Sequence, residues 1–167
     1  MDYKKTPFVL LLLIALLGSG VFWFFNKQPL TKNLMLDKAT SEITFYFSET
    51  VPKDKGDEGI YYLKENYYVK GTYNDKEIKP ILNVMDIMKS RKRSGGQGDI
   101  LVGFTGMNTV NIEFWINDDF YSYTFTDRDN IMRGHKPHTR DVISITLNDG
   151  DFETLASLIK HYGELQE

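Results

Sequence analysis

The sequence predicts an α+β domain with a mainly antiparallel sheet and two packing helices, preceded by one N-terminal transmembrane helix. Three observations support this fold class: one long uncharged apolar run, several short segments with apolar residues at every second position, and two segments with apolar residues at helical spacing. Alternation with period two is typical of half-buried strands, and a spacing of three and four is typical of helices. Neighbouring strands with two separated helices indicate α+β.

The apolar run spans Pro7 to Phe25 and contains 19 residues without a charge. A helix rises about 1.5 Å per residue, so the run is long enough to cross a hydrocarbon core of about 30 Å. Lys4 and Lys5 precede it, which favours the N-terminus in the cytoplasm and the bulk of the chain outside. A cleaved signal peptide is the alternative, because small residues at 18–20 have a plausible cleavage spacing.

The apolar run resumes at 21–25 with a tryptophan among phenylalanines, which favours an uncleaved anchor. We therefore expect a cytoplasmic tail at 1–6, a transmembrane signal-anchor helix at 7–25, a tether at 26–38 and an extracytoplasmic α+β domain at 39–167. The protein would then be a single-pass protein of the inner (cytoplasmic) membrane. Its C-terminal domain would be periplasmic or extracellular.

Composition narrows the class of partner. Residues 33–167 carry 16 lysines and arginines against 22 aspartates and glutamates, a formal net charge of −6. Nucleic-acid binding requires a basic surface, so we expect no nucleic-acid partner. An acidic surface favours a partner with a basic surface. The chain has no cysteine, so disulfides do not contribute to its stability.

The first half of the domain predicts three strands and one helix. The strand candidates are 43–47, 60–63 and 67–73, and the glycine- and charge-rich stretch 51–59 between the first two is expected to be an exposed loop. Apolar residues at helical spacing from Ile78 to Met88, with Pro80 in the first turn, predict a helix. The basic cluster Lys89–Arg93 is expected at the far end of that helix, where cations suit its dipole.

The second half predicts a hairpin, a long loop, a last strand and a helix. Val110–Ile116 and Phe120–Thr126 alternate around a turn at 117–119, which indicates a β-hairpin. Residues 127–141 are expected to form a loop, followed by a strand at 143–147. Apolar residues between Phe152 and Tyr162 form one helical face, and Gly163 ends that helix.

The loop at 127–141 contains the strongest enzymatic candidates. His135, His138 and Asp141 have metal-ligand chemistry, which would support a small metal-dependent hydrolase. The interpretation is disfavoured because Pro137 separates the histidines and neighbouring basic residues repel a cation. Two acidic stretches, 127–130 and 149–151, lack the ligand spacing of a calcium loop. We therefore predict no metal, no cofactor and no catalytic residue, and expect that the protein is not an enzyme.

Aromatic residues in the predicted strands suggest a protein-binding face instead. Neighbouring strand residues point to opposite faces, so tyrosine pairs such as Tyr61–Tyr62 cannot both be buried. Tyrosine and tryptophan are enriched in interfaces because they give a large contact area at low entropic cost. The predicted partner-binding residues are Tyr67, Tyr121, Tyr123, Trp115, Arg128, Arg133, His135 and His138.

These observations favour a membrane-anchored extracytoplasmic protein-binding module, attached to the membrane through Pro7–Phe25. One version is an immunity or inhibitor protein that neutralises an envelope-targeted bacterial toxin or effector with a basic surface. This version is an analogy with other small anchored acidic domains. The alternative is a single-pass structural subunit of an envelope or secretion assembly.

Overall fold

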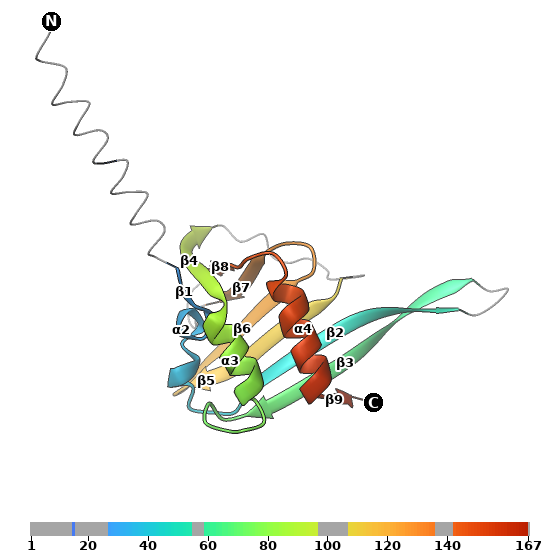
Figure 1. Ribbon diagram of the computed structural model, residues 1–167, viewed down its shortest axis with the longest axis horizontal. Coiled ribbons are helices and arrows are strands. Elements are labelled where there is room, and N and C mark those ends of the chain that lie inside the picture. Colours follow the sequence, from blue (N-terminus) through green and yellow to red (C-terminus); the bar gives the residue numbers. More distant parts are fainter. Residues whose placement is uncertain (1–14, 16–26, 55–58, 97–106, 136–141, 167) are drawn as a thin grey trace, which may run out of the picture.

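The computed structural model describes residues 15, 27–54, 59–96, 107–135 and 142–166. Within these residues, nine strands form one sheet in the order β1-β4-β8-β7-β6-β5-β2-β3-β9, and every neighbouring pair is antiparallel. Helices α3 and α4 lie side by side across one face of the sheet, and α2 lies near the β1 end (Figure 1). The predicted α+β class with a mainly antiparallel sheet is confirmed.

Among the strands of the described residues, half of the neighbouring pairs in the sheet are consecutive in sequence. The strands are β1 (Gln28–Pro29), β2 (Ile43–Asp54), β3 (Ile60–Gly71), β4 (Lys89–Gly96), β5 (Thr109–Ile116), β6 (Asp119–Thr126), β7 (Ile131–His135), β8 (Val142–Thr146) and β9 (Glu164–Gln166). The helices are α2 (Leu30–Leu34), the short 3-10 helix η1 (Leu36–Lys38), α3 (Lys79–Ile87) and α4 (Asp151–Tyr162).

The core lies between the sheet and the helices. Alternate residues of β2, among them Phe45 and Phe47, are buried against the helices, as the period-two pattern predicts. From α4, the ring of Phe152 meets the ring of Phe47 at 6.4 Å and that of Phe125 at 5.1 Å, both edge-on. Edge-on packing is a favoured aromatic geometry, so these contacts fix α4 over β6, β5 and β2, which are neighbours in the sheet.

The hairpin and the last helix are confirmed as predicted. Ile116 pairs with Asp119, and Asn117 in the turn has φ 55°, a left-handed conformation that asparagine tolerates better than most residues. Helix α4 ends where Gly163 donates its N–H to the carbonyl of Ile159 at 2.8 Å. A side chain at Gly163 would meet backbone oxygens, because a Cβ there would lie 2.4 Å from the Ile159 carbonyl.

The prediction of a tether at 26–38 is wrong for the part of this segment that the structure describes. From Gln28 it forms β1, α2 and η1, and Leu30, Leu34 and Leu36 are fully buried in the core. Polar and charged residues separate Leu30 from Leu34 and follow Leu36, so the segment resembles a tether in composition although its leucines are core residues. The folded domain therefore begins near Gln28 rather than at residue 39.

Several predicted loops and one predicted helix end are also corrected. Strand β2 continues to Asp54, and β3 is one strand where two were expected. The basic cluster 89–93 lies in strand β4, not at the end of a helix, because α3 ends at Ile87. Strand β7 occupies 131–135 of the predicted loop, and β9 was not predicted.

The predicted membrane-spanning run lies, apart from residue 15, outside the described residues. Within the described part of the chain, no helix has the length and apolar character needed to cross a membrane.

Candidate partner-binding arm

Three of the predicted partner-binding tyrosines lie on the helix-covered side of the sheet. Tyr67 and Tyr121 are half-buried there, and their rings stack on Phe47 and Phe114 at 6.1 Å and 5.4 Å. Tyr123 is fully buried, so its prediction as a contact residue is wrong. The cause is register: Tyr123 pairs with Ile112 of β5 and with Gly134 of β7, and its ring covers the space that a side chain at Gly134 would need.

Trp115 lies on a different surface from these tyrosines. It is 45% exposed and packs against Phe120, with ring centroids 5.2 Å apart, on the β5–β6 hairpin. Because Trp115 follows the buried Phe114 in the strand, its side chain points to the open face of the sheet. The structure therefore does not bring Trp115 together with Tyr67 and Tyr121.

The predicted loop residues are also dispersed. Arg128 is exposed, and Arg133 is half-buried in an ion pair with Asp129 at 2.7 Å. The backbone of His135 closes strand β7, whereas His138 lies outside the described residues. Among the residues that the structure describes, no three histidines, aspartates or glutamates are grouped in a way that could hold a metal ion.

Among the described residues, four exposed apolar side chains lie together elsewhere, on a two-stranded projection. Strand β5 pairs with β2 from Thr44 to Ser48, and β9 pairs with β3 from Asn66 to Tyr68. Beyond these limits β2 and β3 pair with each other as far as Asp54 and Ile60, and the ribbon extends away from the sheet (Figure 1). We call residues 51–54 and 60–64 the arm.

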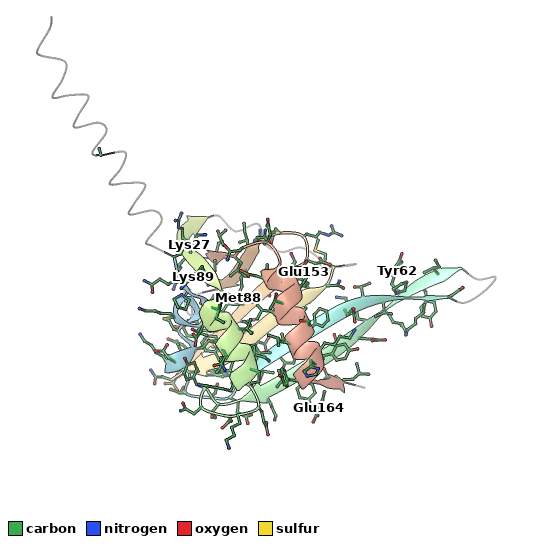
Figure 2. All side chains as sticks on the ribbon, in the orientation of Figure 1. Lys27, Tyr62, Met88, Lys89, Glu153 and Glu164 are labelled. Carbon is green, nitrogen blue, oxygen red and sulfur yellow. The ribbon has the colours of Figure 1, made fainter. Side chains whose placement is uncertain are left out.

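Apolar side chains occupy both faces of the arm. Ile60 and Tyr62 are 67% and 69% exposed on one face, and Tyr61 and Leu63 are 37% and 44% exposed on the other. Figure 2 shows Tyr62 on the projecting ribbon, away from Glu153 and the core. The register pairs Tyr62 with Pro52, so the exposed ring extends an already apolar row. Contiguous exposed apolar residues of this kind often mark an interaction surface.

The base of the arm is held to α4 by a chain of charged contacts. Glu49 and Glu65 lie directly opposite each other in the β2–β3 register, a pairing of like charges that would be unfavourable alone. Lys160 of α4 contacts the Glu49 carboxylate at 2.5 Å and lies 5.2 Å from the centre of the Tyr67 ring. Lys53 contacts Glu65 at 3.3 Å. Each glutamate therefore has its own lysine.

The electrostatics of the base follow from these contacts. The Tyr67 hydroxyl donates to Glu65 at 3.0 Å, and this hydrogen bond and the one from Lys53 lower the pKa of Glu65. Burial and the bond to Glu65 raise the pKa of Tyr67, so the hydroxyl stays protonated. The hydrogen bond to Glu49 raises the pKa of Lys160. The two ion pairs, Lys160 with Glu49 and Lys53 with Glu65, therefore pair the charges at the base of the arm.

A hollow of about 260 Å³ between α2, α3 and Tyr73 is a concave candidate site. Asp37 and Asp86 line it together with Lys32, and Thr31 donates a hydrogen bond to Asp86. Burial raises the pKa of Tyr73, and the two carboxylates raise it further, so the phenol is protonated. Two carboxylates and one lysine line the hollow, so its lining is acidic overall.

The sequence contained one signal for the arm. Tyr61 and Tyr62 are adjacent, so one of the two rings had to be exposed on a strand. The glycines and charged residues of 51–59 predicted a loop, so the continuation of β2 on the other side of the turn was not expected. The arm was therefore missed because β2 was expected to end before it.

No protein-family model matches the sequence, and no curated protein or solved structure is significantly similar to it.

Proposed function

We propose that the protein is a membrane-anchored extracytoplasmic protein-binding module that contacts its partner through the two faces of the arm. The observation that carries this proposal is the exposure of four apolar side chains of the arm, which lies outside the hydrophobic core: Ile60, Tyr61, Tyr62 and Leu63. Burial of each large apolar side chain against a partner would contribute about 1.5–3 kcal/mol of favourable free energy, which is lost while the side chain lies in water. A partner surface is the environment in which this residue choice becomes favourable.

The arm suits binding because it is presented firmly. An isolated two-stranded hairpin is marginally stable in water. Here the hairpin continues two strands of a nine-stranded sheet, and Lys160 fixes its base to α4. Pre-ordering of a binding segment lowers the entropic cost of association, so each buried aromatic ring contributes more to affinity.

The charge of the domain supports a basic partner. The net charge of −6 over residues 33–167 would steer a positively charged protein toward the domain. A secreted toxin that acts on the envelope would meet a domain anchored by Pro7–Phe25 in the same compartment. Immunity against such a toxin is the version of the proposal that these features favour, by analogy with other anchored inhibitors.

The test is partner capture by the full-length chain solubilised from its native membranes. We compare the wild type with a double variant of the arm, Tyr62→Ser with Leu63→Ser, and with a matched double variant of the other exposed aromatic pair, Trp115→Ser with Phe120→Ser. We expect one stoichiometric partner, retained by the Trp115/Phe120 variant and lost by the arm variant. Equal retention by both variants would show that the arm is not the contact surface.

The compartment is tested separately. Protease added to intact spheroplasts should cleave the domain at exposed lysines such as Lys64 and Lys70 while a cytoplasmic marker stays intact. Protection of the domain until the membrane is broken would place it in the cytoplasm. That result would exclude an envelope toxin as the target.

A further inference from the structure

The backbone edge of the arm is a feature that the proposed function does not use. Strand β9 covers β3 at Asn66–Tyr68, and among the described residues no other strand pairs with β3 on that side of Ile60–Glu65. An exposed strand edge of this length is a template for a further strand. The register of β3 with β2 runs from Ile60 to Gly71 without a bulge that would twist this edge away.

The opposite edge of the ribbon, formed by β2, is closed. The backbone N–H of Thr50 donates to the Asn108 side chain at 2.8 Å and so points away from β3. Residues two apart on a strand point their N–H groups to the same side, so the next outward position belongs to Pro52, which has no N–H. Pairing in the plane of the arm is therefore directed to the β3 edge.

We propose that two copies of this chain pair through residues 60–64 of β3, as antiparallel strands related by a two-fold axis. Antiparallel partners directly opposite each other share a face of the sheet, so the two-fold axis requires a register in which one residue faces its own counterpart. The register centred on residue 62 is the one that pairs all of residues 60–64. In that register Tyr62 lies opposite Tyr62 of the second copy. Tyr61 lies opposite Leu63, and Ile60 lies opposite Lys64.

This register is self-complementary. Its central pairs are aromatic or apolar, the cross-strand pairs that stabilise sheets most. The one charged residue in the segment, Lys64, faces Ile60 of the second copy, and the lysine stem can cover that side chain while its ammonium group stays in water. No like charges face each other across the two-fold axis. The two hairpins would form one four-stranded ribbon.

The inference goes beyond the proposed function and does not depend on it. Self-pairing uses the backbone edge of β3, whereas the proposed partner contacts the two faces of the arm. A four-stranded ribbon leaves both faces accessible and doubles the apolar surface that it presents. Loss of self-pairing and loss of partner capture are therefore separate outcomes.

The absence of cysteine from the wild-type sequence permits a direct test of the register. Tyr62→Cys is introduced into the full-length chain and oxidised in native membranes, with Phe120→Cys as the matched exposed aromatic control. Directly opposite strand residues have Cα atoms about 4.5–5.5 Å apart, within the range of a disulfide. We expect a covalent dimer from Tyr62→Cys in several-fold excess over Phe120→Cys.

A second pair of variants tests the symmetry. Ile60→Cys and Lys64→Cys, carried on differently tagged chains, should crosslink to each other when expressed together. Neither should crosslink to itself, because residue 60 and its counterpart would be about 14 Å apart along the strands. Equal dimer yields from Tyr62→Cys and Phe120→Cys would overturn the proposal.

Discussion

The hydroxyl of Tyr123 gives the sharpest test of the packing. The side chain is fully buried between β5 and β7, and among the described residues its Oη has no hydrogen-bond partner. A buried polar group without a partner costs about 1–3 kcal/mol, because its bonds to water are lost on folding. Tyr123→Phe removes this group and leaves the ring, so the variant should be more stable by about 1–3 kcal/mol at neutral pH.

A pH dependence of known sign accompanies this gain. Burial, with a smaller contribution from Tyr121, raises the pKa of Tyr123 from 10.0 to about 12. Between these values the folded state holds a proton that the unfolded state has lost, so rising pH destabilises the wild type. The loss is about 1.4 kcal/mol at pH 11 and rises toward about 2.7 kcal/mol above pH 12. Tyr123→Phe should not show it.

The assay is equilibrium unfolding in urea at pH 7 and pH 11, with the full-length chain in the same detergent throughout. Other groups that titrate at high pH are common to both proteins and cancel in the difference between them. Tyr67→Phe is the control with the opposite sign, because that hydroxyl donates to Glu65. A Tyr123→Phe variant that is less stable than the wild type would refute the reasoning, since it would mean that the hydroxyl makes a favourable bond.

Three further predictions concern other parts of the fold. Gly134→Ala should lower stability by about 1–3 kcal/mol in urea unfolding, because its Cβ would lie 2.3 Å from the Tyr123 ring; a neutral result would show that the two strands can separate. Leu34→Ala should cost about 2–5 kcal/mol in the same assay, whereas a tether would tolerate it. The pKa of Glu65 is lowered by Tyr67 and Lys53, so its stabilising contribution is present above pH 4.5 and lost as pH falls below it. Glu65→Gln should remove that part of the acid sensitivity in unfolding between about pH 3 and 6, and an unchanged profile would contradict the assignment.

The sheet and the C-terminal helix were predictable because their residues repeat with a clear period. In β2, β5 and β6, buried apolar residues alternate with polar ones, and α4 carries its apolar residues on one face. Strand β4 has no such pattern: its side chains are mostly basic, and it joins the sheet through β1 and β8, which are distant in sequence. Helix α2 is short, and its burial depends on contacts with α3 and β4. Tertiary contacts of this kind leave no local signal.

The sequence predicted the type of candidate site, exposed aromatic residues on strands, but not which aromatic residues are exposed. Aromatic strand residues correctly indicated exposed rings, but the choice among them required the register. Tyr123 and Trp115 both lie on the β5–β6 hairpin, yet one is buried and the other exposed. The exposed aromatic residues of the arm lie in β3 and pair with a part of β2 that contains a proline, a lysine and an aspartate. Composition favoured a loop there, whereas continuation of an existing hairpin favoured strand.

The early start of the folded region sets how far the domain can stand from the bilayer. Gln28 already pairs with Ser90, so an anchor that ended at residue 25 would be separated from the first strand by only two residues of sequence. Two extended residues span about 7 Å, whereas the 13 residues of the predicted tether would have spanned about 45 Å. A domain with so short a linker to its anchor would have little freedom to tilt or to move away from the bilayer surface. Every copy in one membrane would hold its arm at nearly the same height.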